Sequence, residues 1–139
     1  MNIIDQLRRD EGEVLHAYQD SRGFWTIGVG VCIDARVNCG ITKAESDILT
    51  QNRVDRITTQ LEQQLPWFAG LDAVRQGAIT NMAYNMGVEG LLKFHQTLEY
   101  IQQGNYEAAA AEMLHSVWAQ QVGDRAQRLS EQVRTGEWK

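Results

Sequence analysis

Apolar residues recur at helical spacing along most of the chain, and only one short stretch near the N-terminus departs from that pattern. The spacing predicts a first helix over 3–11, with Asn2 as its N-cap and Gly12 as its stop. Residues 14–20 and 24–30 are rich in aromatic and β-branched types, and they predict two short strands joined by the turn DSRG. The chain therefore begins with a helix and a β-hairpin.

From residue 42 onward the pattern is helical. Thr42 and Glu45 form a capping box that opens a long helix, which Pro66 ends. Asp72 caps the next helix and Gly87 stops it; its apolar content predicts that it lies at the centre of the core. Further helices are predicted over 89–103, 105–115, 117–121 and 124–135.

These elements predict an α+β fold in a single domain over 1–139. A small β lobe spans about 13–41, and a larger helical lobe spans about 42–139, into which helix 1–12 also packs. The chain is long enough for one good core, and it has no repeat or linker.

Charge and hydropathy exclude several classes of partner. The net charge is −5 and no basic face is clustered, so neither nucleic acid nor an anionic membrane is an expected partner. No run approaches the ~18 apolar residues of a membrane span, so stable insertion is not expected. The N-terminus lacks the basic and apolar regions of a signal peptide, which predicts synthesis in the cytoplasm.

The two cysteines, Cys32 and Cys39, enclose a short loop. Their spacing matches no zinc pattern, and the three histidines of the chain are scattered, so no metal site is expected. A disulfide would stabilise the chain by roughly 2–3 kcal/mol in the loop-entropy model. Two free thiols in a reducing cytosol are equally compatible with the sequence.

The first helix ends on a carboxylate, Glu11. It lies four residues after Leu7, so it continues the apolar stripe, and it occupies the last turn, where the helix field is negative. Both effects favour the neutral acid over the carboxylate. A general acid requires such a group.

Asp20 has a different setting, because it opens a polar turn next to Arg22 and should stay ionised. Thr26, on the second strand, should return close to Asp20 across the hairpin, with a hydroxyl able to help hold a water. Two carboxyl groups in opposite protonation states are what glycoside hydrolysis needs. Each residue also has an ordinary structural explanation: Asp as a turn former, Thr in a strand, and Glu11 paired with Arg8 or with a distant arginine.

These residues occur in a longer frame, L-x-x-x-E-G-x-x-x-x-x-Y-x-D-x-x-G-x-x-T-I-G-x-G, which resembles the catalytic frame of phage-type lysozymes, the T-even-like endolysins of glycoside hydrolase family twenty-four. The resemblance continues in order through GLDAVRQGAITNM (70–82), the M-G-x-x-G-x-x-x-F pattern that ends at Phe94, WAQQVGDRAQR (118–128) and RTGEW (134–138). It covers nearly the whole chain apart from an interruption near 31–41.

The resemblance implies a lysozyme-like fold with the active-site cleft between the two lobes. It also implies hydrolysis of the β-1,4 bond from N-acetylmuramic acid to N-acetylglucosamine in peptidoglycan, with inversion. Glu11 would be the acid, Asp20 would act on the water, and Thr26 would assist. The residues implied as substrate contacts are Tyr84, Thr97, Trp118, Gln121 and Arg125.

The family also implies how such an enzyme works in the cell. We expect a monomer without a cofactor that binds peptidoglycan glycan strands. It would reach the wall in the periplasm after a holin permeabilises the membrane.

This chain departs from the family pattern in two places. The frame usually continues with a histidine where this chain has Val31, and Arg53 aligns with the acidic partner that several relatives carry. Loss of this pair predicts a change in stability and not in catalysis. The segment 32–40 is also shorter than in many relatives, which affects the substrate contacts of the small lobe.

Two other functions compete with a muramidase. A non-catalytic peptidoglycan-binding module could use the same fold, although all three candidate catalytic positions are intact. A lytic transglycosylase would need only the acid, so the presence of Asp20 and Thr26 disfavours it.

Overall fold

Asn2 and Gly12 delimit the first helix as predicted. In the computed structural model, which describes residues 1–139, α1 spans Ile3–Glu11. The Asn2 side chain accepts a hydrogen bond from the Asp5 N–H (3.1 Å), and the Asp5 carboxylate accepts one from the Asn2 N–H (3.2 Å). Gly12 ends the helix with a φ of +76°, a conformation that favours glycine.

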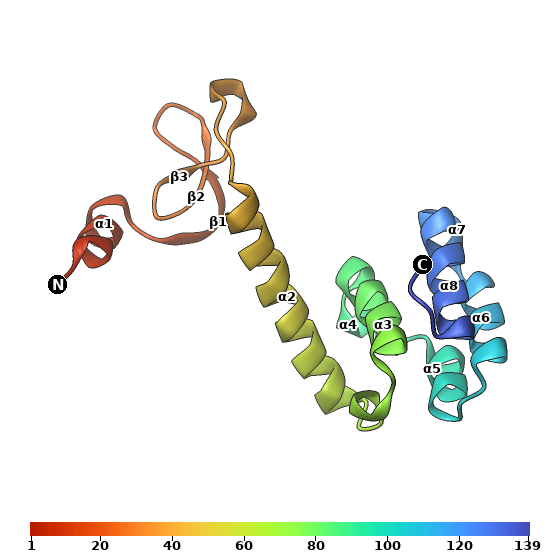
Figure 1. Ribbon diagram of the computed structural model, residues 1–139. Coiled ribbons are helices and arrows are strands. Elements are labelled where there is room, and N and C mark those ends of the chain that lie inside the picture. The colour runs from red at the N-terminus through yellow and green to blue at the C-terminus, as the bar shows by residue number, and fades with distance from the viewer. The chain divides into compact units, whose positions relative to one another are not determined.

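The hairpin is part of a three-stranded antiparallel sheet in the order β1-β2-β3 (Figure 1). The strands are β1 (Val14–Gln19), β2 (Trp25–Gly28) and β3 (Val31–Cys32). The predicted second strand, 24–30, is therefore too long. Gly28 and Gly30 have φ of +66° and +64°, and they turn the chain back into the short third strand, which the sequence did not predict.

The loop after β3 contains a short 3-10 helix, η1 (Ala35–Val37), and is closed by a disulfide between Cys32 and Cys39. Their Cα atoms lie 5.5 Å apart, within the usual range for a cystine. Of the two alternatives that the sequence left open, the structure has the disulfide.

The remaining elements are helical. The chain forms two compact units, Met1–Leu49 and Thr50–Lys139, with the boundary inside α2 (Lys43–Gln64). At the start of α2 the Glu45 N–H donates to Thr42 Oγ1 (3.1 Å), half of the predicted capping box. After it come η2 (Phe68–Gly70), α3 (Ala73–Met86), α4 (Val88–Leu92), α5 (His95–Gln102), α6 (Tyr106–Leu114), α7 (Val117–Val122) and α8 (Asp124–Thr135).

The predicted helix over 89–103 is wrong as a single element, because the chain breaks between α4 and α5. The Lys93 N–H bonds to the Gly90 carbonyl and the Phe94 N–H to the Leu91 carbonyl, in the tight i to i+3 pattern of a helix end. The break directs Phe94 against Trp118, with the two rings edge to face and their centroids 6.2 Å apart. Tertiary packing of an aromatic side chain has overridden the helical pattern.

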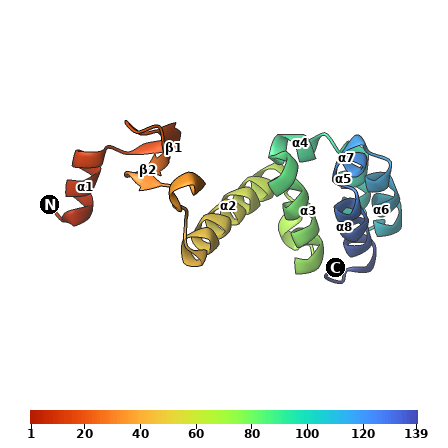
Figure 2. The ribbon, with the colours of Figure 1, turned by 90° about the horizontal axis from the view of Figure 1, so that it is seen from above.

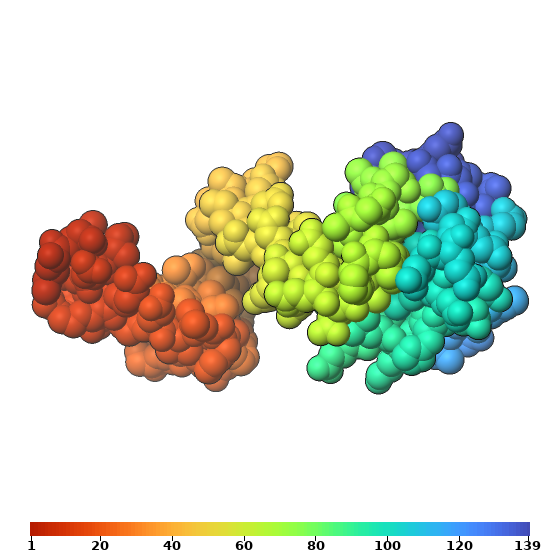
Figure 3. Space-filling view, turned by 90° about the horizontal axis from the view of Figure 1, so that it is seen from below, coloured from red at the N-terminus to blue at the C-terminus, as the bar shows by residue number.

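The apolar core lies entirely in the second unit. α3 contributes Ala78, Ile79, Met82 and Ala83 to it. As its apolar content predicts, α3 gives the core more residues than any other helix, and it packs against α4 and α8, while α6 packs against α5, α7 and α8. Figure 2 shows α6 beside α8, and Figure 3 shows the helices from α3 onward as one closely packed body.

None of the helices combines the length and the apolar composition needed to cross a membrane. The apolar stripe of α1 is exposed: Ile3, Ile4 and Leu7 are 61%, 53% and 42% accessible. That this helix packs on the helical lobe stays a prediction from sequence.

Candidate active site

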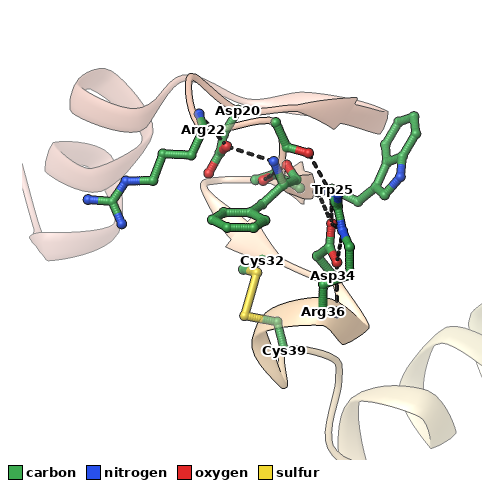
Figure 4. A network of polar contacts seen from close by, with 10 residues as sticks. Asp20, Arg22, Trp25, Cys32, Asp34, Arg36 and Cys39 are labelled. Atoms are coloured by element: carbon green, nitrogen blue, oxygen red, sulfur yellow. Dashed lines mark hydrogen bonds and ion pairs between the residues drawn. A yellow bond between two sulfur atoms is a disulfide. The ribbon is translucent and has the colours of Figure 1, made fainter.

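Asp20 lies in the turn between β1 and β2, and its carboxylate is held by that turn. Oδ1 accepts hydrogen bonds from the N–H groups of Arg22 (2.8 Å) and Phe24 (2.9 Å), and the Asp20 carbonyl accepts one from the Gly23 N–H (2.9 Å) (Figure 4). An aspartate that bonds to backbone two residues ahead is a common way to fix a turn. Both hydrogen bonds to the carboxylate end on Oδ1, and Oδ2 accepts none from the protein.

Thr26 is buried at the centre of the small sheet, with 4% of its surface accessible. It lies opposite Tyr18 on one neighbouring strand and Cys32 on the other. Its Oγ1 donates to the Phe24 carbonyl (3.0 Å), which leaves the oxygen as an acceptor for any further partner.

The two side chains meet at one residue, Phe24. Its N–H donates to the Asp20 carboxylate, and its carbonyl accepts from both the Asp20 N–H (2.9 Å) and the Thr26 hydroxyl. The prediction that Thr26 returns toward Asp20 across the hairpin is confirmed, because both residues bond to Phe24.

Glu11 is the last residue of α1, and its carboxyl group lies against Gly30. A Cβ atom added to Gly30 would be only 2.8 Å from Glu11 Oε2. Gly30 therefore has two reasons to be glycine, its positive φ and this contact. Arg8 pairs with Glu13 (3.0 Å) and Asp5 (3.8 Å), so the ordinary explanation of Glu11 as an ion-pair partner of Arg8 is wrong.

The sequence predicted that Glu11 is partly desolvated as a continuation of the apolar stripe. Within the first unit Glu11 is exposed, as is the stripe itself, and α1 buries none of its residues. The desolvation of Glu11 therefore stays a prediction from sequence, as does the packing of α1 on the helical lobe.

The expected substrate contacts all lie in the second unit, and the structure groups two of them. Tyr84 on α3 and Arg125 on α8 line one open cavity of about 420 Å³. Arg125 is oriented by Asn81, whose Oδ1 accepts from its Nε (2.9 Å) and Nη2 (2.6 Å). Thr97 is buried at the edge of a different cavity, about 330 Å³ in volume.

The other two expected contacts, on α7, are unlike each other. Trp118 is buried, and its Nε1 donates to Asn85 Oδ1 (2.9 Å), while Gln121 is exposed. Trp118 is thus part of the core that joins α7 to α3.

Sequence reasoning missed Asn81 and Asn85, which hold the side chains of Arg125 and Trp118. The available signal was two asparagines four residues apart in an apolar helix, a spacing that places both on one face.

It also missed Asp34 and Arg36, inside the cystine loop. Asp34 is 3% accessible, and its Oδ2 accepts from the Trp25 N–H (2.9 Å). The Arg36 guanidinium first, and the Trp25 N–H second, hold the pKa of the Asp34 carboxyl well below its usual range. An aspartate two residues before an arginine, between two cysteines, was the only signal.

Comparison with known proteins identifies relatives along the whole chain. A family model described as phage lysozyme matches residues 8–135. The chain is 30% identical to probable T4-type lysozyme 1 of Dictyostelium discoideum, across 97% of this chain and 95% of that protein. It is 30% identical to the endolysin of Salmonella phage P22, across 78% of this chain and 76% of the endolysin. It is also 32% identical to the pre-baseplate central spike protein of Enterobacteria phage T4, across 98% of this chain but only 28% of that protein.

The family match extends over the first unit, with its hairpin and its two carboxylates, and over nearly all of the helical unit. The chain therefore belongs to the phage lysozyme family, and it is a glycoside hydrolase that acts on peptidoglycan.

Proposed function

We propose that this enzyme hydrolyses the β-1,4 bond between N-acetylmuramic acid and N-acetylglucosamine, and that it inverts the configuration at the anomeric carbon. The observation that carries the proposal is the link through Phe24, which fixes an aspartate with one free oxygen in the turn and a hydroxyl with acceptor capacity at the start of β2. A water molecule bound between such groups has a defined orientation.

In this mechanism Glu11 is the general acid. It donates its proton to the glycosidic oxygen, which leaves with the N-acetylglucosamine as a hydroxyl. Because Gly30 has no side chain, the carboxyl group of Glu11 has room beside the β2–β3 turn.

Asp20 is the general base. Its free Oδ2 accepts the proton of the attacking water, whose oxygen forms the new bond to the anomeric carbon of N-acetylmuramic acid. Thr26 accepts a hydrogen bond from the same water, since its own proton is directed to the Phe24 carbonyl. An inverting enzyme needs room for this water, and we expect the two carboxyl groups to be roughly 6.5–9.5 Å apart in the substrate complex.

Tyr84 and Arg125 are proposed to bind the glycan directly, because both side chains border an open cavity. Gln121 is exposed and available for the same role. Thr97 and Trp118 are buried, so their proposed contribution is to shape the surface on which the sugar lies.

The proposal also includes how the enzyme reaches its substrate. We propose that it acts as a monomer and without a cofactor, and that it gains access to the wall in the periplasm after a holin opens the membrane. Lysis by the added enzyme of permeabilised but not of intact Gram-negative cells would support this.

The decisive experiment is product analysis on purified sacculi with the wild type, Glu11→Gln and Asp20→Asn. Loss of a general acid or base lowers the rate by about 10²–10⁴-fold, and the wild type should release α-anomeric reducing ends, seen by NMR before mutarotation. Glu13→Gln is the matched control, since it is two residues from Glu11 and should keep wild-type activity.

Each alternative has its own signature in the same assay. Wild-type binding to sacculi without any reducing ends would favour the non-catalytic module. Products with 1,6-anhydro ends would favour a lytic transglycosylase, and retention of the β configuration would contradict inversion.

A further inference from the structure

The cystine loop contains a polar cluster that the catalytic roles do not use. Its centre is the carboxylate of Asp34, the one buried charge of the first unit. Oδ2 accepts from the Trp25 N–H (2.9 Å), and Oδ1 accepts from the N–H of Arg36 (2.9 Å). The Trp25 carbonyl in turn accepts from the Ile33 N–H (2.8 Å), so the loop holds both backbone groups of the residue before Thr26.

Arg36 extends this cluster to the turn that carries Asp20. Its guanidinium bonds to both oxygens of Asp34, and Nη2 also donates to the Gly23 carbonyl (2.7 Å). The same guanidinium lies over the Phe24 ring, 5.5 Å from its centroid. Figure 4 shows Asp34 and Arg36 near Trp25, with the disulfide at the other end of the loop.

The residues contacted are the ones that set the direction of the catalytic groups. Asp20 is oriented by the N–H groups of Arg22 and Phe24, and Thr26 by the Phe24 carbonyl. Gly23, Phe24 and Trp25 form the backbone between these anchors. A shift of this segment would therefore rotate both Asp20 and Thr26.

The disulfide fixes the loop at both ends. Cys32 lies opposite Thr26 in the β2–β3 pair, and the Cys39 N–H donates to the Asp34 carbonyl (3.0 Å).

We propose that Asp34 and Arg36 are positioning residues for the catalytic turn, acting through the backbone of Gly23 and Trp25 to hold Asp20 and Thr26 in their working geometry. This rests on the proposed function, because it takes Asp20 and Thr26 to be catalytic. Neither Asp34 nor Arg36 needs to touch the substrate.

The test uses steady-state kinetics of the full chain on soluble, uncrosslinked glycan strands, together with thermal unfolding. Asp34→Asn and Arg36→Gln should each lower kcat by about tenfold or more, because displacement of reacting groups by about 1 Å costs up to about a hundredfold. KM should stay within about twofold. The double variant should have about the same kcat as either single variant, since each substitution breaks the same Asp34–Arg36 pair.

Two variants separate positioning from mere stability. Asp72→Asn is the matched control: Asp72 caps a helix of the second unit and pairs with Arg75 (3.1 Å), so its loss should lower the unfolding temperature but not kcat. Arg36→Lys keeps the positive charge but loses the planar set of N–H donors. Its kcat should therefore lie between that of Arg36→Gln and that of the wild type. If Asp34→Asn does not fold, Arg36→Gln decides, because the Arg36 side chain is 63% accessible and its loss leaves no cavity.

The outcomes distinguish this proposal from the proposed function. Wild-type kcat in Asp34→Asn and Arg36→Gln, with an inactive Asp20→Asn, would overturn the positioning role alone. Wild-type kcat in Asp20→Asn would overturn both.

Discussion

Different interactions stabilise the interior of each of the two units of this lysozyme. In Thr50–Lys139 the buried residues are mostly apolar, and they form one core from Leu61 to Val133. In Met1–Leu49 the only buried residues are Thr26 and Asp34, both polar and both hydrogen-bonded. The candidate catalytic residues belong to the unit that has directional bonds and a disulfide in place of a core.

This contrast is consistent with the demands on each unit. Apolar contacts supply free energy but little direction, whereas hydrogen bonds and turns fix angles. A carboxylate that must point at one water molecule needs hydrogen bonds and a turn that fix its direction. Four predictions test this comparison, and their outcomes can contradict or refine it.

The largest effect on stability is expected in the apolar core. Phe68 is fully buried, so Phe68→Ala should lower the free energy of unfolding by about 3–5 kcal/mol. Well below the unfolding temperature, kcat should be close to that of the wild type. Denaturant unfolding measures the loss, and Leu15→Ala is the control, because Leu15 is 83% accessible and its removal should cost less than about 0.5 kcal/mol.

Reduction of the disulfide should act on the first unit only. Opening the loop between Cys32 and Cys39 should cost roughly 2–3 kcal/mol. Hydrogen exchange should become faster in β2 and β3 but not in α6 or α8. A Cys32→Ser, Cys39→Ser variant should show no response to reductant, and faster exchange throughout α8 would mean that the two units are not independently stabilised.

Gly30 offers a test that separates activity from stability. Gly30→Ala should cost about 1–2 kcal/mol for the left-handed backbone, and its Cβ would also collide with Glu11 Oε2 at 2.8 Å. We expect kcat to fall by about tenfold or more. Gly104→Ala is the matched control for backbone strain alone, because Gly104 has a φ of +75°, has nothing near its Cβ position and lies outside the turn that carries Asp20. Equal loss of kcat in both variants would contradict the role of the Glu11 contact.

The smallest expected effect is a pH dependence of stability from Asp34. Its pKa is lowered in the folded state by Arg36 and by the Trp25 N–H. A lowered pKa means that the stabilisation is fully present above the unfolded-state pKa of about 3.9, and that it is lost as the pH falls further toward the folded-state value. Unfolding curves between about pH 6 and 2 should show this loss in the wild type and less of it in Asp34→Asn.

Much of the fold could be predicted from sequence because the signals are local. Caps and stops fixed α1 and α3 to the residue, and the turn after β1 required Asp20 to lie near Thr26. The break at Phe94 could not be predicted, because its cause is a tryptophan more than twenty residues away.

The candidate site was chosen from local signals of the same kind. The three candidate catalytic residues followed from their spacing and from the family frame. The bond from Trp25 to Asp34 joins residues nine positions apart through a side chain, and no periodicity marks it. The burial of Glu11 stays a prediction, because helical spacing gives the face on which Glu11 lies but not the element that covers that face.

The Trp25 amide also provides a way to observe the loop directly. Its hydrogen is bonded to a side-chain carboxylate of the cystine loop and not to the strand ladder. That hydrogen can exchange with solvent when the loop opens, even while the ladder between β1 and β2 stays closed. The exchange rate of a single backbone proton would therefore report how often the turn that carries Asp20 loses the hydrogen bonds of the loop.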